Sequence, residues 1–107
     1  MATFLTYKRW RIRDGVDTQA VANMVRDRIV PHYTHYKKLD PTVRLGLEQI
    51  EGSHAVLATQ RWLDRERRDQ TIGGPAFEAW LDAYRPLLED WDRLVEFEAE
   101  WESNELI

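Results

Sequence analysis

The clearest hydrophobic pattern in the chain lies near its C-terminal end. From Val95 to Glu102, apolar residues alternate strictly with glutamates, which predicts a β-strand with one apolar and one acidic face. We expect Phe97, Ala99 and Trp101 to pack under helices, and the acidic face to lie opposite them. That acidic face would carry four glutamates, namely Glu96, Glu98, Glu100 and Glu102.

A complementary basic pattern lies near the N-terminal end. Residues 3–13 are rich in β-branched and aromatic side chains and contain no Gly or Pro, which predicts the first strand. Arg9, Arg11 and Arg13 fall on one face of that strand. If the first and last strands are antiparallel neighbours, the arginines can pair with the glutamates and help to set the register. A solvated acidic face without such partners is the alternative interpretation.

Helical spacing follows the first strand. Asp14-Gly15 predicts a turn, and Asp17 is placed to cap a helix by accepting a backbone N–H. Pro31 lacks an N–H donor, so it should kink this helix or end it near Val30, with residues 32–39 as a bent continuation. The apolar positions of this helix are Val21, Met24, Val25 and Ile29.

The middle of the chain predicts a hairpin and then a second helix. Residues 42–62 contain two strand-like segments around the short connection at 51–53. The charged segment 63–70 predicts a short helical turn, and Gly73-Gly74 breaks the chain before Pro75, which is suited to begin a helix. Pro86 should bend this helix. Its apolar stripe consists of Phe77, Trp80, Leu81, Tyr84, Leu87, Leu88 and Trp91.

The element order is therefore β-α-β-β-α-β, which predicts a single α+β domain of the ferredoxin-like sandwich type over residues 1–107. A chain of 107 residues is typical of one domain. A domain of this size buries only about two-thirds of its unfolded surface, so its core is modest. A second copy packed against the sheet would extend that core.

Composition narrows the functional classes. The net charge of −4, from 19 acidic and 15 basic residues, argues against a dedicated nucleic-acid binder. No apolar segment approaches the ~20 residues that span a bilayer, so we expect no membrane partner. The chain has no Cys, which excludes disulfides, thiolate metal sites and a cysteine nucleophile. With no signal-peptide pattern at Met1–Phe4, we expect a cytoplasmic location.

The histidines give little sign of a metal site. His32 and His35 are three residues apart and can share a helix face, but no third ligand accompanies them. We therefore expect no metal, and helix-end histidines are the simpler interpretation. His54 stands alone at the start of a strand and is a candidate general base.

Aromatic residues are the more informative candidates, because five Trp and four Tyr are many for this length. They either pack the core or line a pocket for a flat apolar ligand. Trp62 ends the third strand, at the mouth of the cleft expected between sheet and helices. The other aromatic candidates for this space are Tyr7, Trp10, Tyr36, Trp80 and Tyr84.

Two segments carry a family resemblance. Residues 56–62, which read VLATQRW, followed by residues 76–81, AFEAWL, resemble the antibiotic biosynthesis monooxygenase family of the dimeric α+β barrel superfamily. Residues 30–33, VPHY, also fit its pattern. The resemblance covers nearly the whole chain in element order. It implies a homodimer whose two sheets face each other as a barrel, with a pocket between each sheet and its helices.

The same resemblance implies a range of activities. Members include oxygenases that add O₂ to phenolic or anthrone-like substrates without a metal or flavin cofactor, others that degrade haem, and several without known activity. Trp62 matches the family tryptophan, but polyketide-oxidising members carry an Asn where this chain has Ala58. Haem-degrading members carry an Asn at the position of Thr6-Tyr7 and an axial His on the second helix. Residues 75–91 contain no His, which argues against haem degradation.

Three functions remain open from the sequence. The leading hypothesis is a cofactor-independent monooxygenase acting on an aromatic, quinol-like or polyketide-type small molecule. Trp62 and the tyrosines would orient the substrate, while Arg61 or His54 would stabilise its anion. A non-catalytic small-molecule-binding or stress-related protein is the alternative, favoured by the missing Asn. A cyclase-like aldol catalyst on the same scaffold is the third. The segment 64–74 is longer than the usual link in the family, so we expect the pocket mouth to differ from the family pattern.

Overall fold

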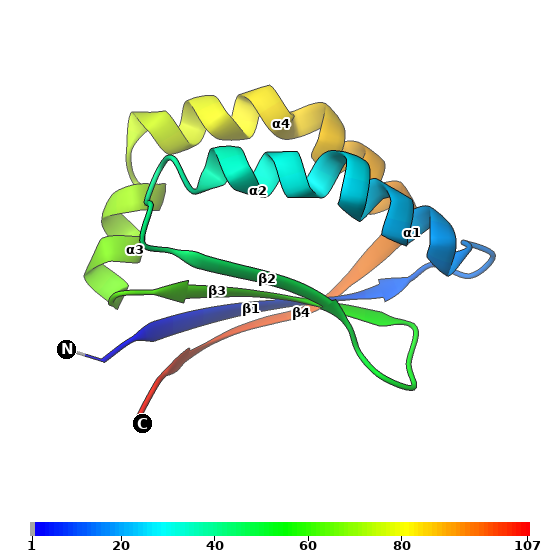
Figure 1. Cartoon of the computed structure of the whole chain (residues 1–107), viewed down its shortest axis with the longest axis horizontal. Coiled ribbons are helices and arrows are strands. Elements are labelled where there is room, and N and C mark those ends of the chain that lie inside the picture. Colours follow the sequence, from blue (N-terminus) through cyan, green and yellow to red (C-terminus); the bar gives the residue numbers. More distant parts are fainter. Residues whose placement is uncertain (1) are drawn as a thin grey trace.

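A computed structural model describes residues 2–107 as a four-stranded antiparallel sheet with every helix on one face (Figure 1). The strand order is β2-β3-β1-β4, with each neighbouring pair antiparallel. This order confirms the predicted α+β ferredoxin-like fold. The elements are β1 (Phe4–Ile12), α1 (Thr18–Met24), the π-helix η1 (Val25–Ile29), α2 (Val30–Tyr36), β2 (Arg44–Gln49), β3 (Ala55–Trp62), α3 (Arg65–Ile72), α4 (Pro75–Leu94) and β4 (Val95–Asn104).

The first helical segment starts as the sequence predicts and passes through its proline. A carboxylate oxygen of Asp17 accepts a hydrogen bond from the backbone N–H of Gln19 at 2.8 Å. The helix then continues through Pro31 to Tyr36, so it does not end near Val30. A π-helical turn lies directly before the proline, and the N–H of Val30 reaches back to Val25. Such turns commonly occur where a helix has to accommodate a distortion.

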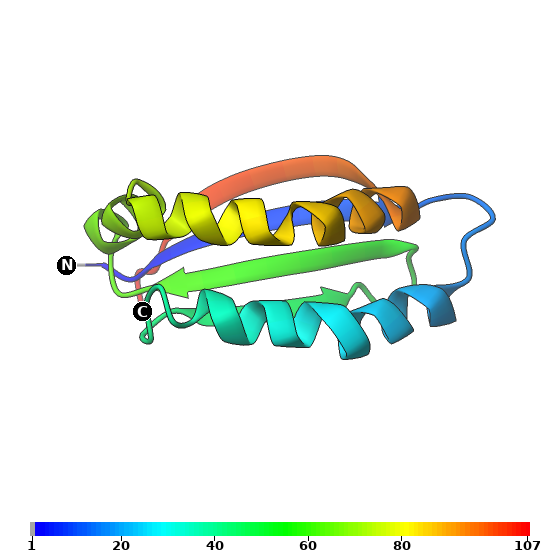
Figure 2. The same cartoon turned by 90° about the horizontal axis from the view of Figure 1, so that it is seen from above.

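The second helical region contains two helices. Asp64 caps α3 by accepting from the N–H of Arg67 at 2.8 Å, and no residue of α3 is buried. Pro75 begins α4 as predicted, and α4 runs without interruption past Pro86. Seen from above, α4 and the continuous α1–α2 segment run side by side over the sheet (Figure 2).

The core consists of two clusters between the helices and the sheet. The larger cluster joins the sheet to α1, η1 and α4, and the smaller one joins it to α2 and the segment before β2. The larger contains Ile12, Val21, Met24, Ile29, Val56, Leu87, Trp91 and Val95, and the smaller contains Phe4, Tyr36, Val43 and Trp62.

Strand β1 lies beside β4, which confirms the predicted neighbourhood of the arginine and glutamate segments. Arg11 forms an ion pair with Glu96 at 2.6 Å, and Arg9 lies 3.6 Å from Glu98. Arg13 instead donates a hydrogen bond to the backbone carbonyl of Asp92 at 2.9 Å. The charge pairing therefore holds for two of the three arginines.

The predicted alternation of β4 is wrong beyond Glu98. Arg9 lies opposite Ala99 but Trp10 lies opposite Phe97, so Glu98 is an extra residue in the ladder. Such a bulge reverses which face the following residues take. Trp101 accordingly stacks on Tyr7, on the face that no helix covers, and Ala99 shares that face.

The same bulge changes the position of the last glutamates. Glu102 accepts hydrogen bonds from Arg65 and Arg68 of α3, so it lies on the helix side of the sheet. The acidic row is thus divided between the two faces. Glu96 and Glu98 pair on the open face, and Glu100 and Glu102 point toward the helices.

Candidate functional site

A cavity of about 380 Å³ lies between the sheet and helices α2 and α4. Every strand contributes to its wall, and α3 lies at one end of it. Most of the lining side chains are aromatic or aliphatic, which is typical of sites for small organic ligands. The lining consists of Thr6, Tyr7, Lys8, Trp10, Ile29, His32, Tyr33, Tyr36, Leu47, Ala58, Gln60, Arg68, Ile72, Phe77, Trp80, Leu81, Leu88, Trp91 and Glu100.

Trp80 is at the centre of an aromatic wall built by α2 and α4. Its ring lies 4.8 Å from Tyr36, edge to face, and 5.7 Å from the stacked ring of Phe77. The imidazole of His32 lies 4.4 Å from it on the other helix. Because these rings pack against one another, they form a rigid apolar surface suited to a planar ligand.

His32 is a buried base in this wall. His32 is only 5% exposed. The centre of the Tyr84 ring lies 4.5 Å from the centre of its imidazole, with the two rings in an edge-to-face arrangement. Its Nδ1 is buried and has no hydrogen-bond partner. Burial, aided by the neighbouring charge of His35, lowers the pKa of His32 from 6.5 to about 4. The imidazole is therefore neutral at neutral pH.

A polar group of residues lies toward the α3 end of the cavity. The hydroxyl of Thr6 donates a hydrogen bond to Oε1 of Gln60 at 3.2 Å. Burial raises the pKa of Tyr36 to about 12, although a hydrogen bond with Gln60 and the charge of Arg68 act in the opposite direction. Tyr36 is therefore a neutral hydroxyl at neutral pH, able to donate and accept hydrogen bonds.

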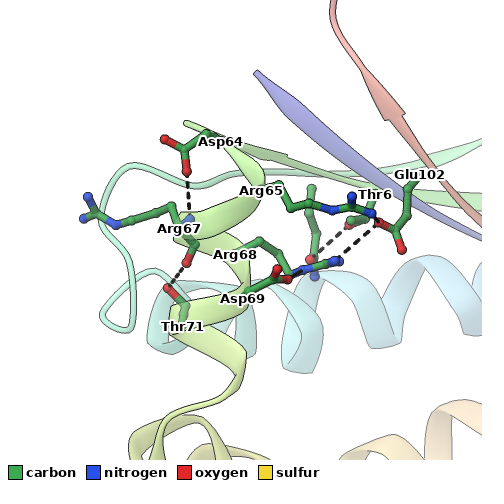
Figure 3. Close-up of polar contacts among 9 residues, drawn as sticks. Thr6, Asp64, Arg65, Arg67, Arg68, Asp69, Thr71 and Glu102 are labelled. Atoms are coloured by element: carbon green, nitrogen blue, oxygen red, sulfur yellow. Dashed lines mark hydrogen bonds and ion pairs between the residues drawn. The ribbon is translucent and has the colours of Figure 1, made fainter. Parts of the chain in front are cut away.

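Helix α3 closes this end through charged contacts (Figure 3). Arg68 and Arg65 both donate to one oxygen of Glu102, at 3.3 and 3.5 Å. The guanidinium of Arg68 also lies 4.8 Å from the centre of the Phe4 ring. Since α3 buries none of its own residues, ion pairs and cation–π contacts largely hold it in place.

A further ion pair of α3 reaches a buried carboxylate. Nε of Arg67 lies 3.2 Å from Oδ2 of Asp40, whose side chain is fully buried. The other oxygen of Asp40 accepts from the N–H and hydroxyl of Thr42, at 2.9 and 2.6 Å. This network joins α3 to the turn between α2 and β2.

Several aromatic residues singled out in the sequence meet at this cavity. Trp10, Tyr36 and Trp80 line it, and Trp10 also packs edge-on against Trp91 at 5.7 Å. Tyr7 belongs to the lining segment of β1, but its ring stacks on Trp101. Tyr84 lies behind the wall, where it packs on His32 and hydrogen-bonds to His35.

The remaining candidates lie outside the lining. Trp62 is 1% exposed and packs in the smaller core cluster, 6.2 Å from Tyr36, with its Nε1 buried and unpartnered. Arg61 pairs with Glu105, and His54 is exposed just ahead of β3. Neither Arg61 nor His54 borders the cavity, so the structure offers no contact through which they would act on a ligand there.

Several polar members of the site were not predicted from the sequence, among them Thr6, Gln60 and Arg68. His32 was predicted to be either one ligand of an incomplete metal site or, more simply, a helix-end histidine. The helical spacing of Ile29, His32 and Tyr36, three and then four residues apart, already placed this histidine on the buried face. Thr6 and Gln60 alternate with neighbours on their strands as core positions do, but nothing in the sequence joins them.

Ala58 is buried on β3 and lines the cavity. Within residues 2–107, no three His, Asp or Glu side chains are grouped so that they could hold a metal ion. No helix in this part of the chain is long and apolar enough to cross a membrane.

Comparison with known proteins places the fold. No protein-family model matches the sequence, and no curated protein sequence matches it. Solved structures do match over nearly the whole chain. SnoaB, a cofactor-independent oxygenase from Streptomyces nogalater, is 12% identical with a TM-score of 0.62, covering 100% of this chain and 96% of its own.

Two further solved structures are similar to this chain over nearly its whole length. A dimeric ferredoxin-like protein from an uncultured marine organism has a TM-score of 0.66 at 13% identity, covering 100% of this chain and 98% of its own. A candidate antibiotic biosynthesis monooxygenase from Chloroflexus aurantiacus has a TM-score of 0.57 at 14% identity, covering 99% and 95%. At these identities the likeness establishes a shared ferredoxin-like fold.

Proposed function

We propose that this chain is a cofactor-independent oxygenase that acts on an aromatic, quinol-like or polyketide-type small molecule. The observation that carries the proposal is the cavity of about 380 Å³, with its aromatic wall and its buried neutral imidazole. The fold shared with SnoaB supports the reaction class. The aromatic wall supports a planar substrate, because flat rings stack on flat rings.

The proposed reaction requires the protein to bind the substrate and to accept a proton from it. An anthrone-type substrate loses a proton to become an electron-rich anion, which gives one electron to O₂. The two radicals combine into a peroxide, and the peroxide loses water to leave a carbonyl. In sum, one CH₂ group and one O₂ become one C=O group and one H₂O, with no external reductant. A dry cavity favours the first electron transfer because water no longer stabilises the substrate anion.

We also propose that two copies associate through the open face of the sheet. Trp101 is 43% exposed there, stacked on Tyr7, and Glu96 and Glu98 form ion pairs with arginines beside it. An apolar centre with a charged rim is typical of subunit interfaces. The similarity to a dimeric ferredoxin-like protein supports the same arrangement.

Oxygen uptake tests the proposed reaction. The purified protein is incubated with anthrones, quinols and naphthols in the presence of a chelator, and O₂ consumption is followed with an electrode. We expect uptake with at least one substrate class. Ala58→Leu fills the cavity floor and should abolish it, whereas Val30→Leu, on the exposed side of α2, should not. No uptake across the panel would sink the proposal.

A non-catalytic binding protein is the second candidate. Ala58 favours it, because this side chain offers no hydrogen bond where the oxidising relatives have an amide. Saturable binding of a panel member without O₂ uptake or product formation would select this function. Isomer formation without O₂ uptake would instead select the cyclase-like alternative.

A further inference from the structure

Two ring nitrogens in the aromatic wall have no hydrogen-bond partner. Nδ1 of His32 and Nε1 of Trp80 are both buried, and the two rings lie 4.4 Å apart. Both residues line the cavity. A buried polar atom without a partner costs roughly 1–3 kcal/mol of stability, so natural proteins seldom keep one without a use.

The surroundings of His32 provide no substitute partner. Tyr84 presents its ring edge to the imidazole while its hydroxyl bonds to His35. Tyr33 packs 5.9 Å away with its own ring tilted. The polar residues Thr6 and Gln60 bond to each other. No protein group therefore occupies Nδ1 of His32, which leaves this nitrogen free to bond to a ligand in the cavity.

The two rings offer complementary hydrogen-bonding groups. An indole N–H can only donate, whereas a neutral imidazole has one nitrogen that accepts. An aromatic hydroxyl can match both at once, because its proton is donated while its oxygen accepts. An ether keeps the oxygen but has no proton to give. A plain hydrocarbon satisfies neither ring.

We propose that the cavity selects hydroxyaromatic ligands, with the hydroxyl donating to the imidazole of His32 and accepting from the indole N–H of Trp80. This inference rests on the proposed function and names its substrate class. In the oxygenase reaction an anthrone-type substrate binds as its enol tautomer, which is a hydroxyaromatic. Its hydroxyl proton moves to the imidazole nitrogen, and the electron pair of the O–H bond stays on the substrate, which becomes the anion that gives an electron to O₂. O₂ is then the co-reactant, as in the proposed reaction. His32 is thus a catalytic residue, because it touches the reacting hydroxyl.

A comparison of 1-naphthol with 1-methoxynaphthalene separates the contribution of the hydroxyl proton to binding from the contribution of the aromatic ring. Equilibrium dialysis at pH 7 measures both dissociation constants for the intact chain. We expect the protein to prefer 1-naphthol by about tenfold, because the ether can still accept from the indole N–H of Trp80 but cannot donate to the imidazole of His32. Absence of binding of either probe, or equal binding of the two, would overturn the inference.

Substitutions of His32 then test whether this residue causes the preference for 1-naphthol over its ether. His32→Phe keeps an aromatic ring in the wall but removes its nitrogens, so the preference should fall to about one while the ether still binds equally well. His32→Gln restores an acceptor and should recover part of it. His54→Phe, a histidine outside the lining, is the matched control and should keep the full preference. A His32→Phe protein that still prefers the naphthol would overturn the inference.

The variants also separate this inference from the oxygenase proposal. His32→Phe removes a buried unpartnered nitrogen, so it should fold, and its melting temperature verifies that. A naphthol preference that depends on His32 without any O₂ uptake supports the binding role and rejects the oxygenase. Undiminished O₂ uptake by His32→Phe supports the oxygenase and rejects the role of this histidine.

Discussion

Tyr7 stacks on Trp101 with ring centroids 5.1 Å apart and planes within 9° of parallel, on the face of the sheet that no helix covers. The hydroxyl of Ser103 lies within 3.4 Å of the Tyr7 hydroxyl at the same place. Large rings left open on one face of a small domain are a common feature of association surfaces. The pair therefore gives the proposed dimer a defined aromatic contact on β1 and β4.

Replacing Trp101 tests the dimer directly. Trp101→Glu places a charge on the open face beside Tyr7, and burying an unpaired carboxylate in an interface is strongly unfavourable. We expect sedimentation to report about twice the 12.7 kDa chain mass for the original protein and a shift to the single-chain mass for the variant. Val30→Glu, at another exposed apolar position on α2, serves as the control and should stay dimeric. A monomeric original protein would contradict this expectation.

The position of this pair shows which parts of the fold could be predicted from the sequence and which could not. Element order, the Asp17 cap and the start of α4 at Pro75 follow from local chemistry, because each depends on residues close in the chain. The face taken by Trp101 does not. It depends on the extra residue at Glu98, which arises only where β4 pairs with β1. Strict alternation cannot reveal a bulge, since the pattern of letters is the same with or without one.

The site was predictable only in part for a related reason. Trp10, Tyr36 and Trp80 could be chosen because large aromatic residues on predicted inner faces have few other places to go. Trp62 could be chosen too, but whether such a residue borders a cavity or fills the core depends on packing in three dimensions. Gln60 meets Thr6 across 54 residues of chain, a relationship that no local pattern contains.

Acid should destabilise the fold through His32. Its pKa is about 4 in the folded protein and about 6.5 when exposed, so the unfolded chain binds more protons between these values. Stability from this group is therefore complete above pH 6.5 and is lost as the pH falls toward 4. Between pH 7 and pH 5 the loss should be about 2 kcal/mol.

Urea unfolding at the two pH values measures this loss. Between pH 7 and pH 5 the free energy of unfolding of His32→Phe should fall by about 2 kcal/mol less than that of the original protein. The other titrating groups are the same in both proteins. The nearby groups are His35 and Tyr33 on α2 and Tyr84 on α4, with Lys8 and Glu100 lining the cavity from the sheet. An identical pH dependence in both proteins would mean that His32 is not held neutral by burial.

The contacts of α3 with Glu102 should control local opening. Glu102→Gln weakens the ion pairs with Arg65 and Arg68, and α3 has no buried side chain to compensate. Amide hydrogen exchange in residues 65–72 should rise about fivefold, as expected for contacts worth about 1 kcal/mol. Glu98→Gln, on the open face of the same strand, should leave this exchange unchanged. Equal exchange in the Glu102 variant would show that other contacts hold the helix.

The most direct measurement of the central claim is the fate of the two oxygen atoms of ¹⁸O₂. The chelator-treated protein is incubated with a hydroxylated anthrone under labelled oxygen, and the product and water are analysed by mass spectrometry. We expect one labelled oxygen atom in the product carbonyl and one in water, with both signals lost in His32→Phe. A product without label, or no product from a protein that binds the substrate, would contradict it.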